Sequence, residues 1–159
     1  MATRRNKSPA EPTTGQINIS AWRFASVSKS RSKNMAAIGS RDTRPEMIVR
    51  SLVHRMGYRF RLHVRNLAGS PDLVLRRHRI IIFVNGCFWH AHQCPQGRRC
   101  PKTNSQYWEG KRARNVERDC RVRRLLRRQG WSVVTVWECQ TKDPHRLEQR
   151  LHKMLNKSP

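Results

Sequence analysis

Hydrophobic residues recur every three or four positions between residues 43 and 56, which is the spacing of a helix buried along one face. Thr43 and Glu46 have the spacing of a capping box at its start, and Gly57 follows its end. The apolar face would consist of Ile48, Val49, Leu52, Val53 and Met56. We therefore predict a first helix over residues 43–56.

The pattern then changes to strict alternation, with Tyr58, Phe60 and Leu62 separated by basic residues, which is typical of a half-buried strand. Two further apolar segments, residues 72–75 and 79–84, lie on either side of a basic turn at residues 76–78. We expect these two segments to pair as a hairpin.

The second half of the chain predicts two helices and one strand. Residues 105–129 contain no helix breaker after Gly110 and are strongly basic, and Gly130 would end this long helix. Residues 131–137 form a short continuous apolar run, typical of a buried strand. A last helix would start at Asp143 and bury Leu147, Leu151, Met154 and Leu155.

Charge narrows the choice of partner, since 34 Lys and Arg against 10 Asp and Glu give a formal net charge of +24 in 159 residues. Such an excess favours a polyanion, because bound Lys and Arg release the counterions that surround nucleic acid. No apolar segment has the length of a membrane-spanning helix, so the sequence favours nucleic acid over a membrane.

The chain has the length of one domain with a short extension. Residues 1–28 are basic and rich in Ser and Thr without a sustained periodicity, so we expect a disordered basic tail before a domain over residues 29–159. No apolar stretch follows Arg4 and Arg5, so we expect no export signal and a reducing compartment. The five cysteines are then metal ligands or free thiols.

The motif NGCFWHAHQC, Asn85 to Cys94, directly follows the apolar run at residues 80–84. It brings together metal ligands, proton-transfer groups and aromatic rings just beyond the end of a rigid strand. This is where we expect the functional site.

Asp72 is the only acidic residue between Glu46 and Glu109. Hydrolysis of a phosphodiester with a divalent ion needs a carboxylate to hold that ion, and Asp72 stands at the start of a predicted strand. The alternative is an ordinary turn aspartate after Pro71.

Cys87, His92 and Cys94 have the ligand types and spacing of a zinc site, and a closed tetrahedral site needs one more ligand. Cys139, directly after a predicted strand, is our candidate, and Cys100 competes with it on spacing. Buried free thiols are the alternative for the whole set.

The two histidines of the motif are not distinguished by spacing. In an extended segment His90, His92 and Cys94 would point the same way, so either histidine could bind zinc and the other could act in catalysis. A closed set of four ligands would make the zinc structural, holding the loop that carries His90.

Several segments resemble the very-short-patch-repair (Vsr) DNA mismatch endonucleases, over residues 30–156 in total. They are RSKNMAAIGSRDTRPE (31–46), GSPDLV (69–74), FVNGCFWHAHQC (83–94), NVERD (115–119) and VWEC (136–139). The order of elements is also similar to the restriction-endonuclease-like core. The resemblance implies an α/β fold in which a central mixed sheet is flanked by helices and the active site lies on the second and third strands.

The resemblance also implies roles for the site residues. Asp72 and the Val84 backbone carbonyl would bind catalytic Mg2+, and His90 would activate the attacking water. His92 would join the cysteines as a zinc ligand, and Glu46 would help to orient the catalytic groups besides capping its helix. Asn85 occupies a position where relatives commonly have histidine.

In most chains aromatic residues belong to the hydrophobic core. In the Vsr enzymes that this chain resembles, they insert between neighbouring DNA bases. The resemblance implies this use for Phe88, Trp89 and Trp108. Phosphate contacts are expected from nearby basic residues, and Asn115 and Asp119 could support the site or read bases. The remaining expected DNA-binding residues are Met35, Lys111, Arg112 and Arg114.

The residues and the resemblance together predict a metal-dependent DNA endonuclease that nicks one strand of duplex DNA at a mispaired thymine. The resemblance implies that the nick lies 5′ of the thymine in T:G mismatches produced by deamination of 5-methylcytosine. The resemblance implies a monomer in the bacterial cytoplasm, used at the nucleoid, with mismatch-repair proteins such as MutL as partners. One alternative is a related nuclease of different specificity, such as one for host defence, because residues 95–105 match the family less well. The other is a zinc-stabilised DNA-binding module without catalysis.

Overall fold

The computed structural model describes residues 41–156, in which four strands form one mixed sheet in the order β1-β2-β3-β4. Neighbouring pairs are antiparallel except for β3 and β4, which are parallel with Asn85 beside Trp137. The strands are β1 Arg61–Leu62, β2 Leu73–Leu75, β3 Ile80–Asn85 and β4 Ser132–Trp137. A turn of 3-10 helix, η2 Arg76–His78, joins β2 to β3 and confirms the expected hairpin.

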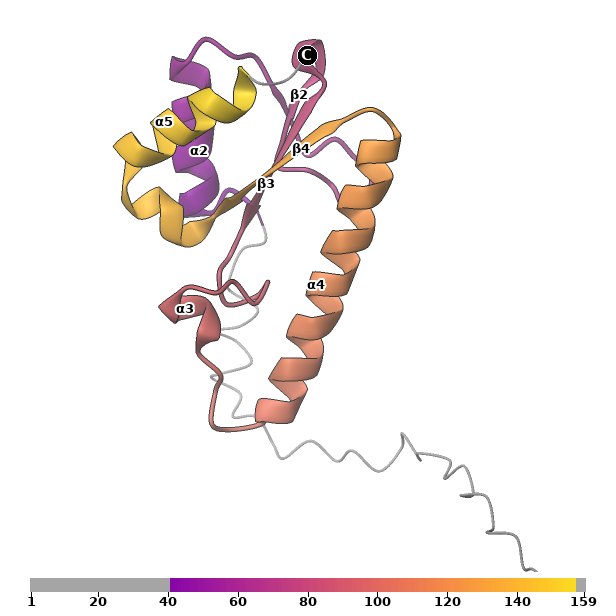
Figure 1. Ribbon diagram of the computed structural model, residues 1–159, viewed down its shortest axis with the longest axis vertical. Helices are drawn as coiled ribbons and strands as arrows, with labels where there is room; N and C mark the ends of the chain where they lie inside the picture. The colour runs from indigo at the N-terminus through magenta and orange to yellow at the C-terminus, as the bar shows by residue number, and fades with distance from the viewer. Residues whose placement is uncertain (1–40, 157–159) are drawn as a thin grey trace, which may run out of the picture. The chain divides into compact units, whose positions relative to one another are not determined.

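Helices cover both faces of this sheet (Figure 1). One face packs against α2 Arg44–Arg55 and α5 Pro144–Leu155, and the other against α4 Ser105–Arg128. Alternate residues of β3 point to opposite faces, so Ile80 and Ile82 join the α2 and α5 side while Ile81 packs with Leu126 of α4. This double burial explains why the β3 sequence is continuously apolar.

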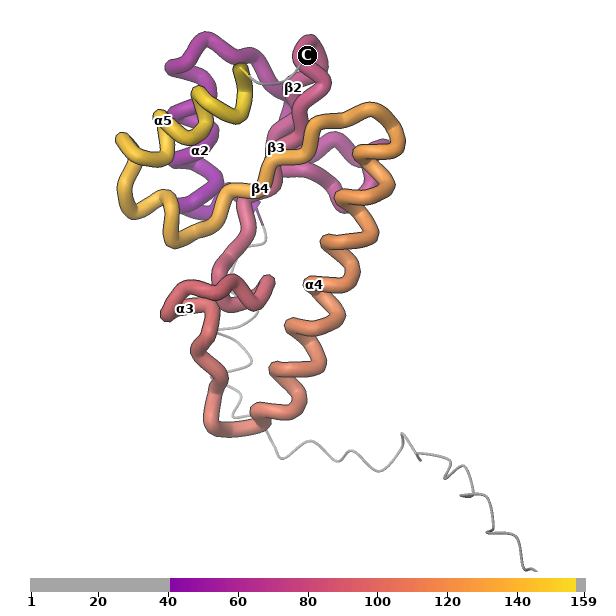
Figure 2. Tube along the Cα trace, in the orientation of Figure 1, coloured from indigo at the N-terminus to yellow at the C-terminus, as the bar shows by residue number. Residues whose placement is uncertain are grey.

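The trace leaves β3 at Asn85 and forms a loop, the four-residue helix α3 Pro95–Arg98 and the connection to α4 (Figure 2). α4 is 24 residues long, and its first half extends past the sheet alongside this loop (Figure 1). A 3-10 segment, η3 Glu138–Lys142, joins the end of β4 to α5.

The start of α2 differs from the expected capping box. The Thr43 side chain accepts no hydrogen bond from the helix. Its hydroxyl instead donates to Glu46 at 2.8 Å, and the Asp42 amide donates to the same carboxylate at 3.0 Å. Glu46 is only 4% exposed, so its buried charge takes up these donors.

Two strand predictions need correction. Only Arg61 and Leu62 pair with β2, while Tyr58 and Phe60 pack against the core as irregular chain. In β4 only Val136 is fully buried, because β4 lies at an edge of the sheet rather than inside it. The short helix α3 was not expected within the loop after the motif.

The expected tail over residues 1–28 and Met35 lie outside the described residues. Among residues 41–156, no helix combines the length and apolar character needed to cross a membrane.

The packing of α4 on the sheet can be tested with two adjacent leucines. Leu126 is fully buried and Leu125 is 44% exposed. We expect Leu126→Ala to lower the free energy of unfolding by about 2–5 kcal/mol, because it leaves a cavity between α4 and the sheet. Leu125→Ala, with the same change in helix propensity, should cost less than about 1 kcal/mol. Urea denaturation of both variants measures the difference, and equal losses would contradict this packing.

Candidate active site and metal centre

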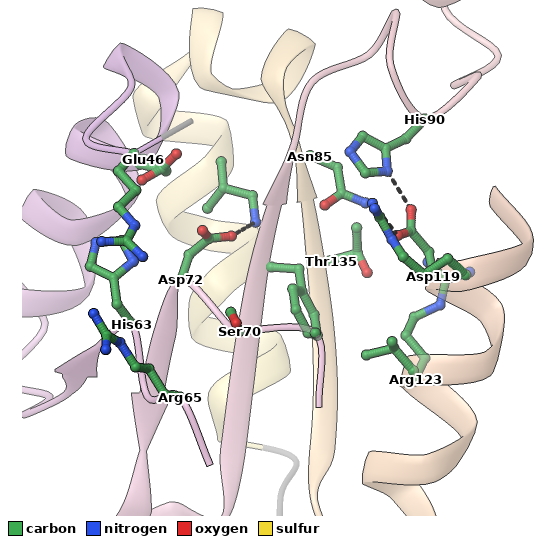
Figure 3. Close-up of a pocket in the computed structure, with 16 residues that line it drawn as sticks. Glu46, His63, Arg65, Ser70, Asp72, Asn85, His90, Asp119, Arg123 and Thr135 are labelled. Atoms are coloured by element: carbon green, nitrogen blue, oxygen red, sulfur yellow. Dashed lines mark hydrogen bonds and ion pairs between the residues drawn. The ribbon is translucent and has the colours of Figure 1, made fainter. Parts of the chain in front are cut away.

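A cavity of about 580 Å3 opens beside the ends of β2 and β3, with walls from α2, the loop after β1, α4 and β4. Figure 3 shows Asp72 in its middle, with Glu46 and His63 on one side and His90 and Asp119 on the other. The structure thus brings together the three residues expected to act in catalysis, Glu46, Asp72 and His90.

Asp72 lies one residue before β2 and is tied to the neighbouring strand, since the Val84 amide donates to its Oδ2 at 2.7 Å. Burial raises the pKa of Asp72 to about 6; the Val84 hydrogen bond lowers it and the nearby charge of Glu46 raises it further. A buried carboxylate with one oxygen held by backbone is a suitable hard ligand for a divalent cation, whose charge would offset the burial.

His90 is oriented from α4. Its Nδ1 bonds to the Asp119 carboxylate, and Figure 3 shows the ring facing the cavity. Four residues earlier on the same helix face, Asn115 Nδ2 donates to the Trp89 carbonyl at 3.1 Å. Through these two hydrogen bonds α4 contacts the loop that carries His90.

His63 also lines the cavity, although the sequence pattern did not mark it as a site residue. Its Nε2 lies 3.4 Å from Arg50 Nη2, and Arg50 also donates to Glu46 at 3.1 Å. The alternating pattern made His63 look like an outward residue of a strand. In the structure the chain leaves β1 at His63, which has a φ of 48°, and this turn places the ring at the cavity.

Beyond the end of β3, ligand atoms of Cys87, His92, Cys94 and Cys139 all lie within 4.8 Å of one another. Bonds of about 2.3 Å to a tetrahedral ion put sulfur ligands roughly 3.8 Å apart, so this donor set fits a metal ion. Cys100, the competing candidate, is exposed and lies 3.7 Å from a Glu109 oxygen instead.

The surroundings of this cluster hold its ligands in place. The Cys139 amide donates to the Cys87 sulfur at 3.3 Å, and the His92 ring stacks on Trp137 at 4.3 Å between centroids. Glu138, which no sequence motif marked, accepts a hydrogen bond from the Cys87 amide at 3.1 Å. Burial raises the pKa of Cys87 to about 12, so a thiolate at this position needs a cation beside it.

The aromatic side chains of Phe88, Trp89 and Trp108 form a separate cluster outside both hydrophobic cores. Ring centroids of Phe88, Trp89 and Trp108 lie 5.1 to 5.9 Å apart, edge to face. Lys111 Nζ lies 5.2 Å from the Trp89 centroid. All three rings are partly exposed, which disfavours a purely structural core role.

Arg112 and Arg114 differ in their surroundings. Arg112 donates to the carbonyls of Gly97 and Arg99, the latter at 3.2 Å, and so joins α4 to the end of α3. Arg114 is exposed.

Comparisons with known proteins agree with this geometry. Residues 26–96 match the family described as DNA mismatch endonuclease Vsr. The Type II nicking enzyme V.XorIIP of Xanthomonas oryzae pv. oryzae is 46% identical over 78% of this chain and 90% of its own length. DNA mismatch endonuclease Vsr of Escherichia coli is 43% identical over 74% of each chain.

A solved structure shares the fold. The catalytic domain of homing endonuclease I-Bth0305I has a TM-score of 0.50 and 21% identity, covering 70% of this chain and 93% of that one. The expected α/β core, a mixed sheet flanked by helices in the manner of restriction endonucleases, is confirmed.

The proposed metal-binding cluster of Cys87, His92, Cys94 and Cys139 leads us to expect different effects from substituting different cysteines. We expect Cys139→Ser to lower both the bound metal per chain and the melting temperature, because one of four ligands is lost. Cys100→Ser and Cys120→Ser should change neither, since both thiols are exposed and outside the cluster. Elemental analysis and thermal denaturation measure both quantities. If Cys100→Ser were the damaging change, the fourth ligand would be wrongly assigned.

Proposed function

This chain belongs to the Vsr family of DNA endonucleases, and from that premise we propose that it nicks one strand of duplex DNA 5′ of the thymine in a T:G mismatch. The observation that carries the proposal is the adjacency of Trp89 and His90. Trp89 belongs to the partly exposed aromatic cluster, and His90 lines the cavity with Asp72. Opening of a base step and attack on the backbone can therefore be coupled through one loop.

In this proposal Asp72 and the Val84 carbonyl hold Mg2+. When bound, the ion supplies positive charge that stabilises the developing charge on the scissile phosphate. The His90 imidazole takes a proton from the attacking water, and Asp119 fixes the tautomer by bonding to Nδ1, which leaves Nε2 as the base. Glu46, held by Thr43 and Arg50, lines the cavity with Asp72 and helps to orient the water.

Zn2+ is the ion proposed for the cluster of Cys87, His92, Cys94 and Cys139. Three sulfurs and an imidazole are ligands that zinc prefers, and four protein donors leave no open position for chemistry. The ion would therefore be structural. It would join the loop after β3 to the end of β4 and so fix the position of His90.

Specificity for a mismatch follows from the cost of opening the stack. Aromatic wedges unstack a base step at a cost of roughly a few kcal/mol, and a mispaired base lowers that cost. The E. coli relative carries the name of a mismatch endonuclease, while other relatives are named nicking enzymes. A nuclease of different specificity is therefore the second candidate, since the two kinds of relative are similarly close.

The proposal also includes features that rest on the family resemblance. These are deamination of 5-methylcytosine as the source of the mismatch, a monomeric enzyme with a basic tail at residues 1–28, and action at the bacterial nucleoid with mismatch-repair proteins such as MutL.

The roles of Asp72 and His90 can be tested by substitution. Asp72→Asn and His90→Ala should each lower the single-turnover nicking rate at least about 100-fold, because a metal ligand or a general base is removed. Binding to the mismatched duplex should change little, since it depends mainly on basic residues. Glu117→Gln and His145→Ala are matched controls at exposed positions and should nick normally. Near-normal nicking by either site variant would remove that residue from the mechanism.

Trp89 should determine how strongly the enzyme prefers a mismatch. We expect wild type to have a higher kcat/KM on T:G than on T:A duplexes of identical context, and Trp89→Ala to reduce that ratio more than it weakens binding. Arg114→Gln should weaken binding to the T:G and T:A duplexes equally, because a phosphate contact carries no sequence information. Equal nicking of T:G and T:A by wild type would favour the nuclease of different specificity.

A further inference from the structure

The second half of α4 is unusually basic. Residues 118–128 contain six arginines and a single acid, Asp119. The favourable interaction of cations with the carboxyl end of a helix accounts for Arg127 and Arg128 in the last turn. It does not account for Arg121 and Arg124, which lie further from that end.

These arginines face away from the proposed active site. At 100° per residue, Asn115, Asp119, Val122 and Leu126 share the helix face that contacts the His90 loop and the sheet. Arg121, Arg124 and Arg128 lie near the opposite side and are exposed. Neither the cavity nor the packing of α4 uses them.

A shallow groove of about 480 Å3 lies on the flank of the helix, between these arginines and the face that carries Arg123. It is lined by Cys120 and by four arginines, with no acidic residue: Arg123, Arg124, Arg127 and Arg128. Within residues 41–156, Arg121, Arg124, Arg127 and Arg128 have no acidic partner within ion-pair distance. Like charges four residues apart, such as Arg124 and Arg128, destabilise a helix, so this pattern works against α4 itself.

We infer that the outer face of α4, formed by Arg121, Arg124, Arg127 and Arg128, is a second binding surface for duplex DNA, separate from the nicking cavity. Arg121 and Arg128 are seven residues apart, or about 10 Å along the helix, which spans roughly three base pairs of a duplex. Arginine side chains on one face suit phosphate oxygens, which accept two hydrogen bonds from one guanidinium.

A membrane is a poorer occupant for this face. A helix that lies on a membrane needs an apolar face directed at the lipid, and the apolar residues Val122 and Leu126 of α4 already pack on the sheet. The surface holds a flanking arm of the same duplex whose mismatch lies at the cavity, because contact with about three base pairs is too small an interface to hold a separate duplex.

The test uses the full chain without divalent ions, so that no DNA is nicked. A short T:G duplex with one dye and a longer matched duplex with another are mixed with the protein, and complexes with both dyes are counted. The affinities for a 16-base-pair and a 60-base-pair T:G duplex are measured in parallel. A gain in affinity with length, without two-dye complexes, supports the flanking arm. Two-dye complexes without that gain would identify a separate duplex and contradict the proposal.

The decisive variant carries Arg124→Gln, Arg127→Gln and Arg128→Gln, because Gln keeps helix propensity and Arg123, which also lines the cavity, is unchanged. Its affinity for the 60-base-pair duplex should fall at least 10-fold, and the slope of log affinity against log salt should become shallower by about 0.9 per lost phosphate contact. In a separate assay with Mg2+, nicking of the short T:G duplex should stay within about twofold of wild type.

The control variant carries Lys142→Gln, Arg146→Gln and Lys153→Gln, an equal loss of charge at exposed positions of η3 and α5. Equal loss of binding in both variants would show a general charge effect and overturn the proposal. Loss of short-duplex nicking in the α4 variant would also overturn it, by placing these arginines at the cavity. Displacement of the long duplex by anionic phosphatidylserine vesicles would also overturn the proposal. Absence of T:G nicking in wild type would instead contradict the proposed function and leave this binding result intact.

Discussion

The hydrogen bond from the Val84 amide to the Asp72 carboxylate joins the two strands on which the site depends. β3 is paired on both edges, with β2 antiparallel and β4 parallel, and its isoleucines are fully buried. Its end is therefore rigid. Two residues beyond Asn85 the chain reaches Cys87, and two residues beyond Trp137, the partner of Asn85, it reaches Cys139. The parallel register of β3 and β4 thus brings the metal cluster together at the same sheet end as the carboxylate.

α4 supplies the second constraint on the site. Its carboxyl-terminal half is fixed to the sheet through Leu126, and its earlier turns hold the loop after β3 through Asn115 and Asp119. The cluster of Cys87, His92, Cys94 and Cys139 brings the same loop to the end of β4. A loop held from two directions can carry an imidazole and an aromatic wedge in adjacent positions without losing its geometry. The outer face of α4 carries the arginines of the proposed second DNA-binding surface.

Sequence patterns were sufficient for the long elements and for the motif. Helical periodicity located α2 and α5, because each buries one apolar face, and the absence of helix breakers located α4. Ligand types and spacing located the cluster of Cys87, His92, Cys94 and Cys139. The sequence patterns did not predict features that depend on contacts between residues far apart in the chain. His63 reaches the cavity through a positive φ that no alternation reveals, and Glu138 supports Cys87 from 51 residues away. Tyr58 and Phe60 alternate like strand residues, yet they pack on the core without pairing.

The central claim is that one strand end positions two different metal sites, a catalytic ion at Asp72 and a structural ion among Cys87, His92, Cys94 and Cys139. Anomalous diffraction from crystals soaked in Mn2+, recorded at the zinc and manganese edges, tests this claim most directly. The account predicts a zinc peak within the cysteine cluster and a manganese peak beside Asp72 and the Val84 carbonyl. A zinc peak bound by His90, or manganese absent from Asp72, would contradict it.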